Sequence, residues 1–540
     1  MWQDQWSGKT IGTVLHDAAQ RWRGREAMIF ENGTLTYQDL EQSSAVIARA
    51  FLGLGIGYAD VVAVWMAGYA EWPPIYYGLA RIGARIAPVN TRYKPHELEY
   101  VLNKSKARLL IFKDEPPEKK DYRTLLYELC PEIESGLQRP SARLPYLERV
   151  IAISDRSLPG CLSFADFRTS GTGVSDATLA EAEKKVSPED IALLQFTSGT
   201  TADPKGAMLY QMAMLRGAHY PSLPLKVTEH DRYFSAQPFF HAGGSIKVML
   251  APIVTGCTMV VQSYFDPGEA LYLMEKHRCN ITMGHQPHWV EYLNHPDLNK
   301  RKLRLDRAMS FASPEVNRRV REELGLEKLI SPYGLTETHL GGTSCETDDP
   351  LEKRMGTVGR PMIGVEMGIR AAEGPEFMSR GEQGEVCFRG WCTMKGYFDD
   401  PERTKAVLDS EGWLRTGDLG VVDDDGYLRL VGRIKDMVRV GGENVAAADV
   451  EGFLLRHDKV KQVVVVGMPD PRLTEVCAAF VELKPGAAVT EDELLAYCRN
   501  GLASFKAPRK IIFTTDWPMT GAGKIQRYVL RDSLGKMQGQ

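Results

Sequence analysis

The chain has 540 residues, of which 43% are hydrophobic and 25% are charged, a composition typical of soluble globular proteins. It is too long for one compact core, so we expect at least two domains. Its 66 lysines and arginines nearly balance 70 aspartates and glutamates, leaving a formal net charge of −4. That balance argues against a nucleic-acid-binding protein, because such affinity depends on excess positive charge.

The first half of the chain alternates between two patterns. Short apolar runs predict strands at 61–66, 85–88, 108–112, 150–154 and 191–196. Apolar residues at helical spacing predict helices at 40–54, 75–82 and 97–103. Residues 114–145 are rich in Glu, Lys and Pro and predict a surface excursion. The alternation predicts a parallel sheet covered on both faces, and further strands at 258–262 and 280–284 indicate a second sheet.

After about residue 360 the pattern changes. Strands and hairpins are predicted at 384–389 and 421–431, the latter around an Asp-rich turn. Beyond Gly432, strands at 463–466 and 478–483 and a helix at 491–500 predict a small independent domain.

The nine cysteines include no CxxC pair, which favours reduced, mostly buried thiols in a cytoplasmic protein. No apolar run reaches the roughly 18–20 residues that span a bilayer, so we expect no integral membrane association. No signal peptide is evident at the N-terminus.

A dense hydroxyl- and glycine-rich loop follows one predicted strand, with the sequence LQFTSGTTADPKG at 194–206. Its backbone amides, hydroxyls and Lys205 have the chemistry to surround phosphate oxygens. It is not a Walker P-loop, since Lys205 precedes Gly206 instead of being followed by Ser or Thr. A flexible surface loop is the alternative, which the ordered pattern disfavours.

This loop and the motifs after it resemble the adenylate-forming superfamily of acyl-CoA synthetases, luciferases and non-ribosomal adenylation domains. The further motifs occur in the family's order: YGLTET at 333–338, GEVCFRG at 384–390, TGD at 416–418, GRIKDMVRVGGEN at 432–444 and PMTGAGKIQR at 518–527. The resemblance implies an α/β fold: a large N-terminal domain of two αβαβα sheets plus a β-rich subdomain, and a small mobile α+β C-terminal domain. We place these domains at 1–434 and 435–540, with a hinge at Lys435.

The resemblance also implies a nucleotide site. The residues expected to bind ATP and AMP are Thr197, Ser198, Gly199, Thr200, Thr201, Lys205, Tyr333, Gly334, Asp418 and Arg433. Thr336 and Glu337 would contact the α-phosphate and Mg²⁺, a cation that prefers carboxylate and phosphate oxygens. Asp418 would accept hydrogen bonds from both ribose hydroxyls. Taken singly, Thr336 could equally be a helix cap and Asp418 a turn residue.

Three further assignments follow from the resemblance. Lys524 would bridge the substrate carboxylate and the α-phosphate, relieving the repulsion between two anions; alone, it reads as an exposed tail lysine. His241, in PFFHAGG, would lie near the acyl carboxylate, although a lone His is more often structural. Gly441 and Gly442 would admit the pantetheine arm of CoA, or form a tight turn between strands, or both.

The expected acyl pocket is apolar and lined by Phe239, Phe240, Gly244, Trp289 and Phe311. The chain departs from the family pattern at four places: Ala202, Asn444–Ala447, Thr474, which replaces a usual Gly, and the glycine-poor Ser310–Val316.

The sequence therefore predicts an ATP-dependent carboxylic acid–CoA ligase that forms AMP through an acyl-adenylate and acts on a hydrophobic medium-chain, aromatic or alicyclic acid. ATP, Mg²⁺ and CoA are the expected cofactor and co-substrates, and a homodimer is among the assemblies allowed. The alternatives are a stand-alone enzyme that loads a carrier protein, a luciferase-like oxygenase and a non-catalytic nucleotide-binding relative.

Overall fold

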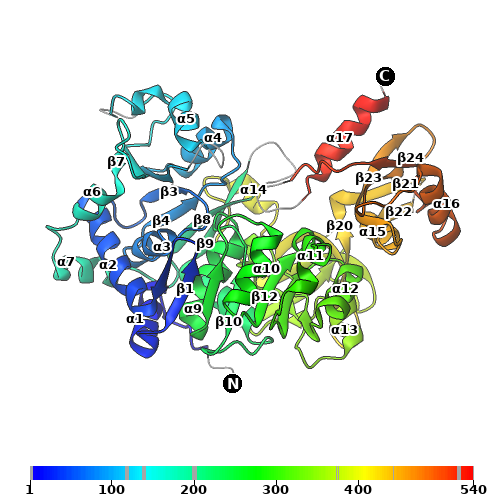
Figure 1. The fold of residues 1–540 in the computed structure, drawn as a ribbon, viewed down its shortest axis with the longest axis horizontal. Coiled ribbons are helices and arrows are strands. Elements are labelled where there is room, and N and C mark those ends of the chain that lie inside the picture. Colours follow the sequence, from blue (N-terminus) through cyan, green and yellow to red (C-terminus); the bar gives the residue numbers. More distant parts are fainter. Residues whose placement is uncertain are drawn as a thin grey trace.

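The computed structural model describes residues 4–115, 121–136, 141–197, 204–371, 374, 376–441, 443–519 and 525–538. A large α/β region is followed along the chain by an antiparallel sheet and then by a small C-terminal domain, which lies to one side of the rest (Figure 1). The expected fold class is confirmed.

The first large sheet has the strand order β7-β6-β5-β3-β4-β8-β9. Its strands are β3 (Val61–Trp65), β4 (Arg85–Pro88), β5 (Leu109–Lys113), β6 (Arg149–Ile153), β7 (Leu162–Ser163), β8 (Ile191–Thr197) and β9 (Lys205–Tyr210). Pairing is parallel except between β8 and β9. Because β3 is buried along its whole length, its five residues can all be apolar.

The second large sheet has the order β14-β13-β12-β10-β11-β1-β2 and is parallel except for the edge strand β2. Its strands are β1 (Glu26–Phe30), β2 (Gly33–Thr36), β10 (Arg232–Ser235), β11 (Thr258–Val261), β12 (Ile281–His285), β13 (Arg307–Phe311) and β14 (Lys328–Ile330).

Helices cover both sheets (Figure 1). Those of the large region are α1 (Ile11–Trp22), α2 (Tyr37–Gly53), α3 (Trp72–Arg81), α4 (Pro95–Ser105), α5 (Tyr122–Leu129), α6 (Phe164–Thr169), α7 (Asp176–Lys184), α8 (Gln211–His219), α9 (Met249–Thr255), α10 (Pro267–Lys276), α11 (Gln286–Leu293), α12 (Pro314–Leu324), α13 (Leu351–Gly356) and α14 (Pro401–Lys405). The largest core cluster joins α1, α2, α3, α8 and α9 to strands of both sheets, so the two sheets share one hydrophobic core.

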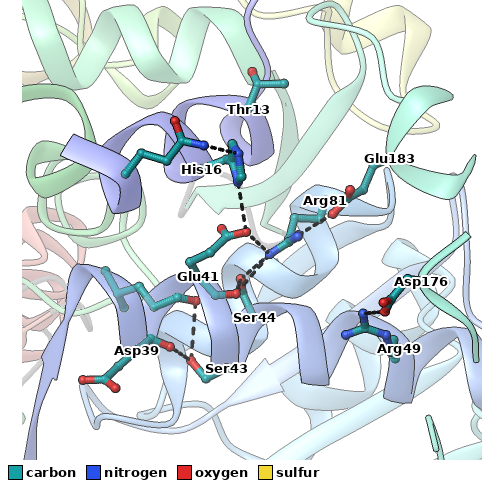
Figure 2. Close-up of polar contacts among 12 residues, drawn as sticks. Thr13, His16, Asp39, Glu41, Ser43, Ser44, Arg49, Arg81, Asp176 and Glu183 are labelled. Atoms are coloured by element: carbon teal, nitrogen blue, oxygen red, sulfur yellow. Dashed lines mark hydrogen bonds and ion pairs between the residues drawn. The ribbon is translucent and has the colours of Figure 1, made fainter. Parts of the chain in front are cut away.

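An arginine with a mostly buried side chain links three helices of this layer (Figure 2). Arg81, at the end of α3, pairs through Nε with Glu183 of α7 at 2.6 Å and through Nη1 with Glu41 of α2 at 3.2 Å. Nη1 also donates to Ser44 Oγ at 3.0 Å. The Arg81 side chain is only 9% exposed, so these partners compensate the loss of its hydration.

The expected surface excursion at 114–145 contains a packed helix instead. Tyr122, Leu126 and Leu129 of α5 are buried against the outer face of the first sheet. The apolar residues recur at helical spacing within a charged segment, and the charged positions face solvent.

The β-rich subdomain is an antiparallel sheet of order β17-β18-β19-β20. Its strands are β17 (Val365–Arg370), β18 (Gln383–Gly390), β19 (Leu414–Val422) and β20 (Leu428–Arg433), and a short pair, β15 (Thr343–Ser344) and β16 (Arg360–Pro361), precedes it. The pairing of β19 with β20 confirms the predicted hairpin and places Asp418 opposite Arg433.

The C-terminal domain has its own core and a mixed sheet. Its elements are β21 (Met437–Val440), β22 (Glu443–Ala446), α15 (Ala447–Leu454), β23 (Val460–Asp470), β24 (Thr474–Leu483), α16 (Glu491–Gly501), β25 (Lys510–Phe513) and α17 (Arg527–Gln538). It contacts the large region through Lys461, whose Nζ lies 2.8 Å from Glu291 Oε1 of α11.

All nine cysteines are free thiols, and eight of them are buried. In the described part of the chain, no helix is both long and apolar enough to cross a bilayer.

Candidate active site

One large cavity, of about 1420 Å³, collects most of the sequence-predicted site residues. It is lined by the ends of strands from the large region, by the β-rich subdomain and by Met519, Gln526 and Tyr528 of the C-terminal domain. In parallel sheets such clefts lie at the carboxyl ends of the strands, where loops replace the hydrogen-bond ladder.

The phosphate-loop residues flank this cavity where they are described. Thr197 ends β8, Lys205 begins β9, and both line the cavity. Lys205 Nζ lies 4.9 Å from the centroid of the Tyr397 ring, a cation–π contact. Ser198, Gly199, Thr200 and Thr201 lie outside the described residues.

Tyr333, Asp418 and Arg433 form a linked polar group in the cavity wall. The Tyr333 hydroxyl donates to Asp418 Oδ2 at 2.6 Å, and Arg433 Nε lies 3.0 Å from Oδ1 of the same carboxylate. Burial and the Asp418 charge raise the pKa of Tyr333 well above its usual range, so the phenol stays protonated and remains a donor.

The part of β19 that precedes Asp418 is held by a carboxylate that the sequence reasoning missed. Glu385 of β18 is buried, accepts a hydrogen bond from the Gly417 amide at 2.9 Å and pairs with Arg415 at 3.2 Å. Gly417 has a φ of +73°, a conformation that suits glycine. Glu385 stands at the start of the GEVCFRG motif, so its place in that motif was an available signal.

Thr336 and Glu337 occupy a single 3₁₀ turn at the cavity. The Tyr397 hydroxyl donates to Glu337 Oε1 at 2.9 Å, and among the described residues no hydrogen bond or ion pair engages Oε2. Burial and the Glu337 charge raise the pKa of Tyr397, which keeps that hydroxyl a donor. A carboxylate held in this way suits a hard cation that needs oxygen ligands.

Gly334 and His339 shape the backbone around this turn. A Cβ on Gly334 would lie 2.7 Å from the backbone of Leu340, so only glycine packs there. His339 is fully buried, accepts the Tyr210 amide at Nε2 and lies 2.7 Å from the Cys392 carbonyl through Nδ1. Burial lowers the pKa of His339 to about 4, so the ring is neutral and structural at pH 7.

Lys435, two residues after Arg433, also lines the cavity. Burial and the nearby ammonium of Lys205 lower the pKa of Lys435. Two lysines that are far apart in the chain therefore line the same cavity, a distribution of charge that favours an anionic ligand.

His241 lies on the cavity wall, where its Nδ1 accepts the Gly243 amide at 3.3 Å. Its segment is held by Gln195 of β8, which donates to the Phe240 carbonyl at 2.6 Å and accepts from Ser245 Oγ at 2.9 Å. Periodicity cannot identify a role of this kind, because Gln195 stands inside an otherwise apolar strand.

The expected acyl-pocket residues separate into two groups. Phe240 and Phe311 line the cavity, and the Phe311 ring lies 5.0 Å from that of His285. Phe239, Gly244 and Trp289 do not line it. Phe239 packs against Trp72, and Trp289 is fully buried with its indole N–H on the Gly284 carbonyl.

Gly244 is buried because neighbouring backbone leaves no room for a side chain. A Cβ on it would lie 2.2 Å from the Pro238 carbonyl oxygen. The glycine-poor segment Ser310–Val316 ends β13 and begins α12, whose first turn is capped by Ser313.

Gly441 directly follows β21, does not line the cavity and has a φ of +58°. Gly442 and Lys524 lie outside the described residues. Met519 and Gln526, which flank Lys524 along the chain, line the cavity.

Comparisons with known proteins agree with this arrangement. Residues 15–398 match the AMP-binding enzyme family and residues 449–524 match the AMP-binding enzyme C-terminal domain. YngI of Bacillus subtilis (strain 168), designated an acyl-CoA synthetase, is 36% identical over 98% of this chain and 97% of its own. A Mycobacterium tuberculosis ligase that forms a methyl-dioxo-octahydroindenyl propanoyl-CoA is 34% identical over 97% of this chain and 99% of its own.

Among solved structures, the anthranilate CoA ligase AuaEII in complex with anthranoyl-AMP superposes with a TM-score of 0.88 at 26% identity, covering 99% of this chain and 98% of that one. The predicted resemblance is thus confirmed over the whole chain. The protein belongs to the AMP-binding enzyme family and is an AMP-forming acid–CoA ligase.

Proposed function

We propose that the cavity binds Mg²⁺-ATP and a hydrophobic carboxylic acid of medium-chain, aromatic or alicyclic type. The carboxylate oxygen attacks the α-phosphorus, and pyrophosphate leaves with its bonding electrons. The CoA thiol, losing its proton, then attacks the acyl carbonyl, and AMP leaves. A free carboxylate is a poor electrophile, and adenylation converts it into one with a good leaving group.

The convergence of Asp418, Glu337 and Lys205 on one cavity carries this proposal. Asp418 offers two carboxylate oxygens to neighbouring ribose hydroxyls, and the Tyr333 ring offers a flat apolar face to a purine. Lys205 and Lys435 supply positive charge for the triphosphate.

Glu337, with Thr336 beside it, is the proposed Mg²⁺ ligand. When bound, the ion would neutralise charge on the phosphates. Tyr397 holds the carboxylate in position through Oε1. Lys524 and the phosphate-loop hydroxyls Ser198, Thr200 and Thr201 are assigned by resemblance, as are Gly441 and Gly442 for CoA and Lys435 as the hinge between 1–434 and 435–540.

The acid class is supported by the apolar part of the wall, formed by Phe240, Met283, Met309, Phe311 and Leu340. The mammalian relatives named medium-chain acyl-CoA ligases are about one-third identical, with 33% for the bovine protein. A cytoplasmic location stays a prediction that rests on the free thiols, because those relatives are named as mitochondrial. The oligomeric state, a homodimer included, also stays a prediction.

The test is to supply ATP, Mg²⁺, CoA and a panel of acids, and to follow pyrophosphate, AMP and the loss of free thiol together. The proposal expects all three to change in equal amounts with a hydrophobic acid. Pyrophosphate and AMP without thiol loss would favour the carrier-loading alternative. No pyrophosphate from any acid would contradict the proposal altogether.

A further inference from the structure

A lysine lies within the acyl wall. Lys247 belongs to a π-helical turn, Gly243–Val248, that continues from His241, and it lines the same cavity. Its side chain is 3% exposed, and its neighbours in the turn, Ile246 and Val248, are wholly buried. The ammonium is therefore surrounded by the protein core except where it meets the cavity.

The protein satisfies this ammonium only in part. Lys247 Nζ donates to the Ala218 carbonyl at 3.0 Å and to Ser222 Oγ. No carboxylate among the described residues lies within ion-pair distance of it. A protonated lysine has three N–H donors, so one donor is left for a group that enters the cavity. Burying a cation without a counter-charge costs stability, and Lys247 is such a cation.

Burial lowers the pKa of Lys247 to about 7, as expected for an ammonium that lacks a counter-charge. The pKa of the adjacent His219 is lowered to about 4, mainly by its own burial and secondly by the positive charge of Lys247. An anionic or strongly accepting ligand would pair with the ammonium of Lys247 and so offset the free-energy cost of burying its charge.

A second polar group in the same wall lacks a partner. Gln237 is 2% exposed, lines the cavity, and its amide nitrogen Nε2 is buried with no hydrogen-bond partner. Buried amide donors are nearly always satisfied, so an unsatisfied one at a ligand cavity points to a ligand acceptor. Lys247 and Gln237 thus offer donors, and neither offers a charge that would repel an oxygen.

Lys247 stands apart from His241 along its helix. It follows His241 by six residues, which is more than one turn of the π-helical segment Gly243–Val248. Apolar side chains, including Pro221, Met283 and Leu340, line the cavity as well. The wall therefore combines apolar side chains with two buried donors, one of which is set apart from His241.

From this geometry we propose that Lys247 and Gln237 bind a second oxygen group of the substrate, so that the preferred acids are medium-length carboxylic acids with a distal keto or carboxylate oxygen. This inference rests on the proposed function and refines its substrate class. Both groups present the same acceptor chemistry to an ammonium and an amide N–H, and the experiment separates them.

The experiment compares three acids of one chain length: octanoate, 7-oxooctanoate and octanedioate. Pyrophosphate release with ATP and Mg²⁺ gives kcat/KM for each acid. We expect the intact enzyme to prefer at least one oxygenated acid over octanoate by about tenfold or more, because donors left unpaired by an alkyl chain are penalised. A higher value for the keto acid or for the diacid identifies which oxygen group the site takes.

Lys247→Met keeps the side chain's length and removes its charge. We expect it to lower kcat/KM for the preferred oxygenated acid by about tenfold and to raise that for octanoate, so that the ranking reverses. Gln237→Met should move the ranking in the same direction by a smaller factor. Ser222→Ala is the matched control, because it removes a protein partner of Lys247 and leaves the ammonium, and the ranking should persist.

The outcomes separate the two proposals. If the intact enzyme releases pyrophosphate with none of the three acids and with no aromatic or alicyclic acid either, the proposed function fails as well. If it is active with aromatic or alicyclic acids alone, only the inference is overturned. If the intact enzyme activates octanoate best, only the inference is overturned. The same holds if Lys247→Met lowers kcat/KM for all three acids by one common factor and leaves the ranking unchanged, as in Ser222→Ala; Lys247 then has a structural role. Should Lys247→Met fail to fold, the ranking of the intact enzyme and of Gln237→Met still decides the matter.

Discussion

Tyr333 and Asp418 are 85 residues apart in the chain, yet the phenol of one donates a 2.6 Å hydrogen bond to the carboxylate of the other. Arg433 takes the other carboxylate oxygen at 3.0 Å. The carboxylate is therefore oriented by the protein itself, which reduces the ordering cost of binding a ribose.

Asp418→Asn should lower kcat/KM for ATP by about 10- to 100-fold, because one charge-assisted acceptor is lost and Arg433 loses its counter-charge. ATP–pyrophosphate exchange at varied ATP measures the effect. Asp424→Asn, at an exposed turn of the same sheet, is the matched control. An Asp418→Asn value equal to that of the control would exclude a ribose role.

Glu337→Gln should raise the Mg²⁺ concentration needed for half-maximal adenylation and lower kcat by about 100-fold or more, because an amide oxygen is a weaker ligand than a carboxylate. Tyr397→Phe should produce a smaller change in the same direction, since it only frees Oε1. Magnesium titrations of the initial rate check both. An unchanged magnesium dependence in Glu337→Gln would rule out the assignment.

Lys524→Ala should abolish adenylation and spare the transfer of chemically supplied acyl-adenylate to CoA, because the ammonium is needed only where two anions meet. The two half-reactions are followed separately, by pyrophosphate release and by thiol loss. Near-normal overall turnover of the variant would refute this role. A loss of both half-reactions would point to a defect in the fold.

Thr474 is a β-branched residue with a φ of +69°, at a position where the family resemblance implies a glycine. Left-handed backbone costs a non-glycine residue roughly 1–2 kcal/mol, so Thr474→Gly should stabilise the C-terminal domain by about 1 kcal/mol. Thr474→Ala, which retains a Cβ, is the paired control and should gain less. Urea denaturation that follows this domain measures both, and a destabilised glycine variant would contradict the argument.

The stability of the protein should rise with pH above 7 through Lys247. Its pKa is about 7 in the folded protein and near 10.5 when unfolded, so the unfolded chain binds the extra proton between these values. Stability then increases across that window at up to about 1.4 kcal/mol per pH unit, and the contribution levels off below pH 7. His219, with a pKa of about 4, stays neutral there, and burial raises the pKa of Cys257 to about 11.

Urea midpoints at pH 7, 8 and 9 for the intact protein and Lys247→Met test this linkage. The intact protein should gain more stability with pH than the variant does. Parallel curves would show that the lysine has the same proton affinity in both states.

The sequence predicted the fold best where one local signal decided the structure. The run Val61–Trp65 could only be a buried strand, and β4 occupies the residues expected for it. Helix α5 was missed because its three buried residues are diluted by charged neighbours. The antiparallel edge strands β2 and β9 depend on pairing between elements, which a local pattern does not contain.

The site divides in the same way. Glu337 and Asp418 stand in dense motifs, whereas Tyr397 acts through a contact 60 residues away that only the fold creates. Lys247 interrupts the apolar run SIKVML, which marks it as unusual, but periodicity alone does not say whether it faces solvent or a cavity. Trp289 was expected at the acyl wall on residue type, and its packing against Gly284 keeps it in the core.

The placement of Lys205 and Lys435 has a consequence for turnover. Burial and the ammonium of Lys205 lower the pKa of Lys435, so we expect an anion bound between the two lysines to favour the close approach of their segments. We expect the departure of pyrophosphate to restore the repulsion between the two ammonium groups. Product release would then be coupled electrostatically to separation of these segments.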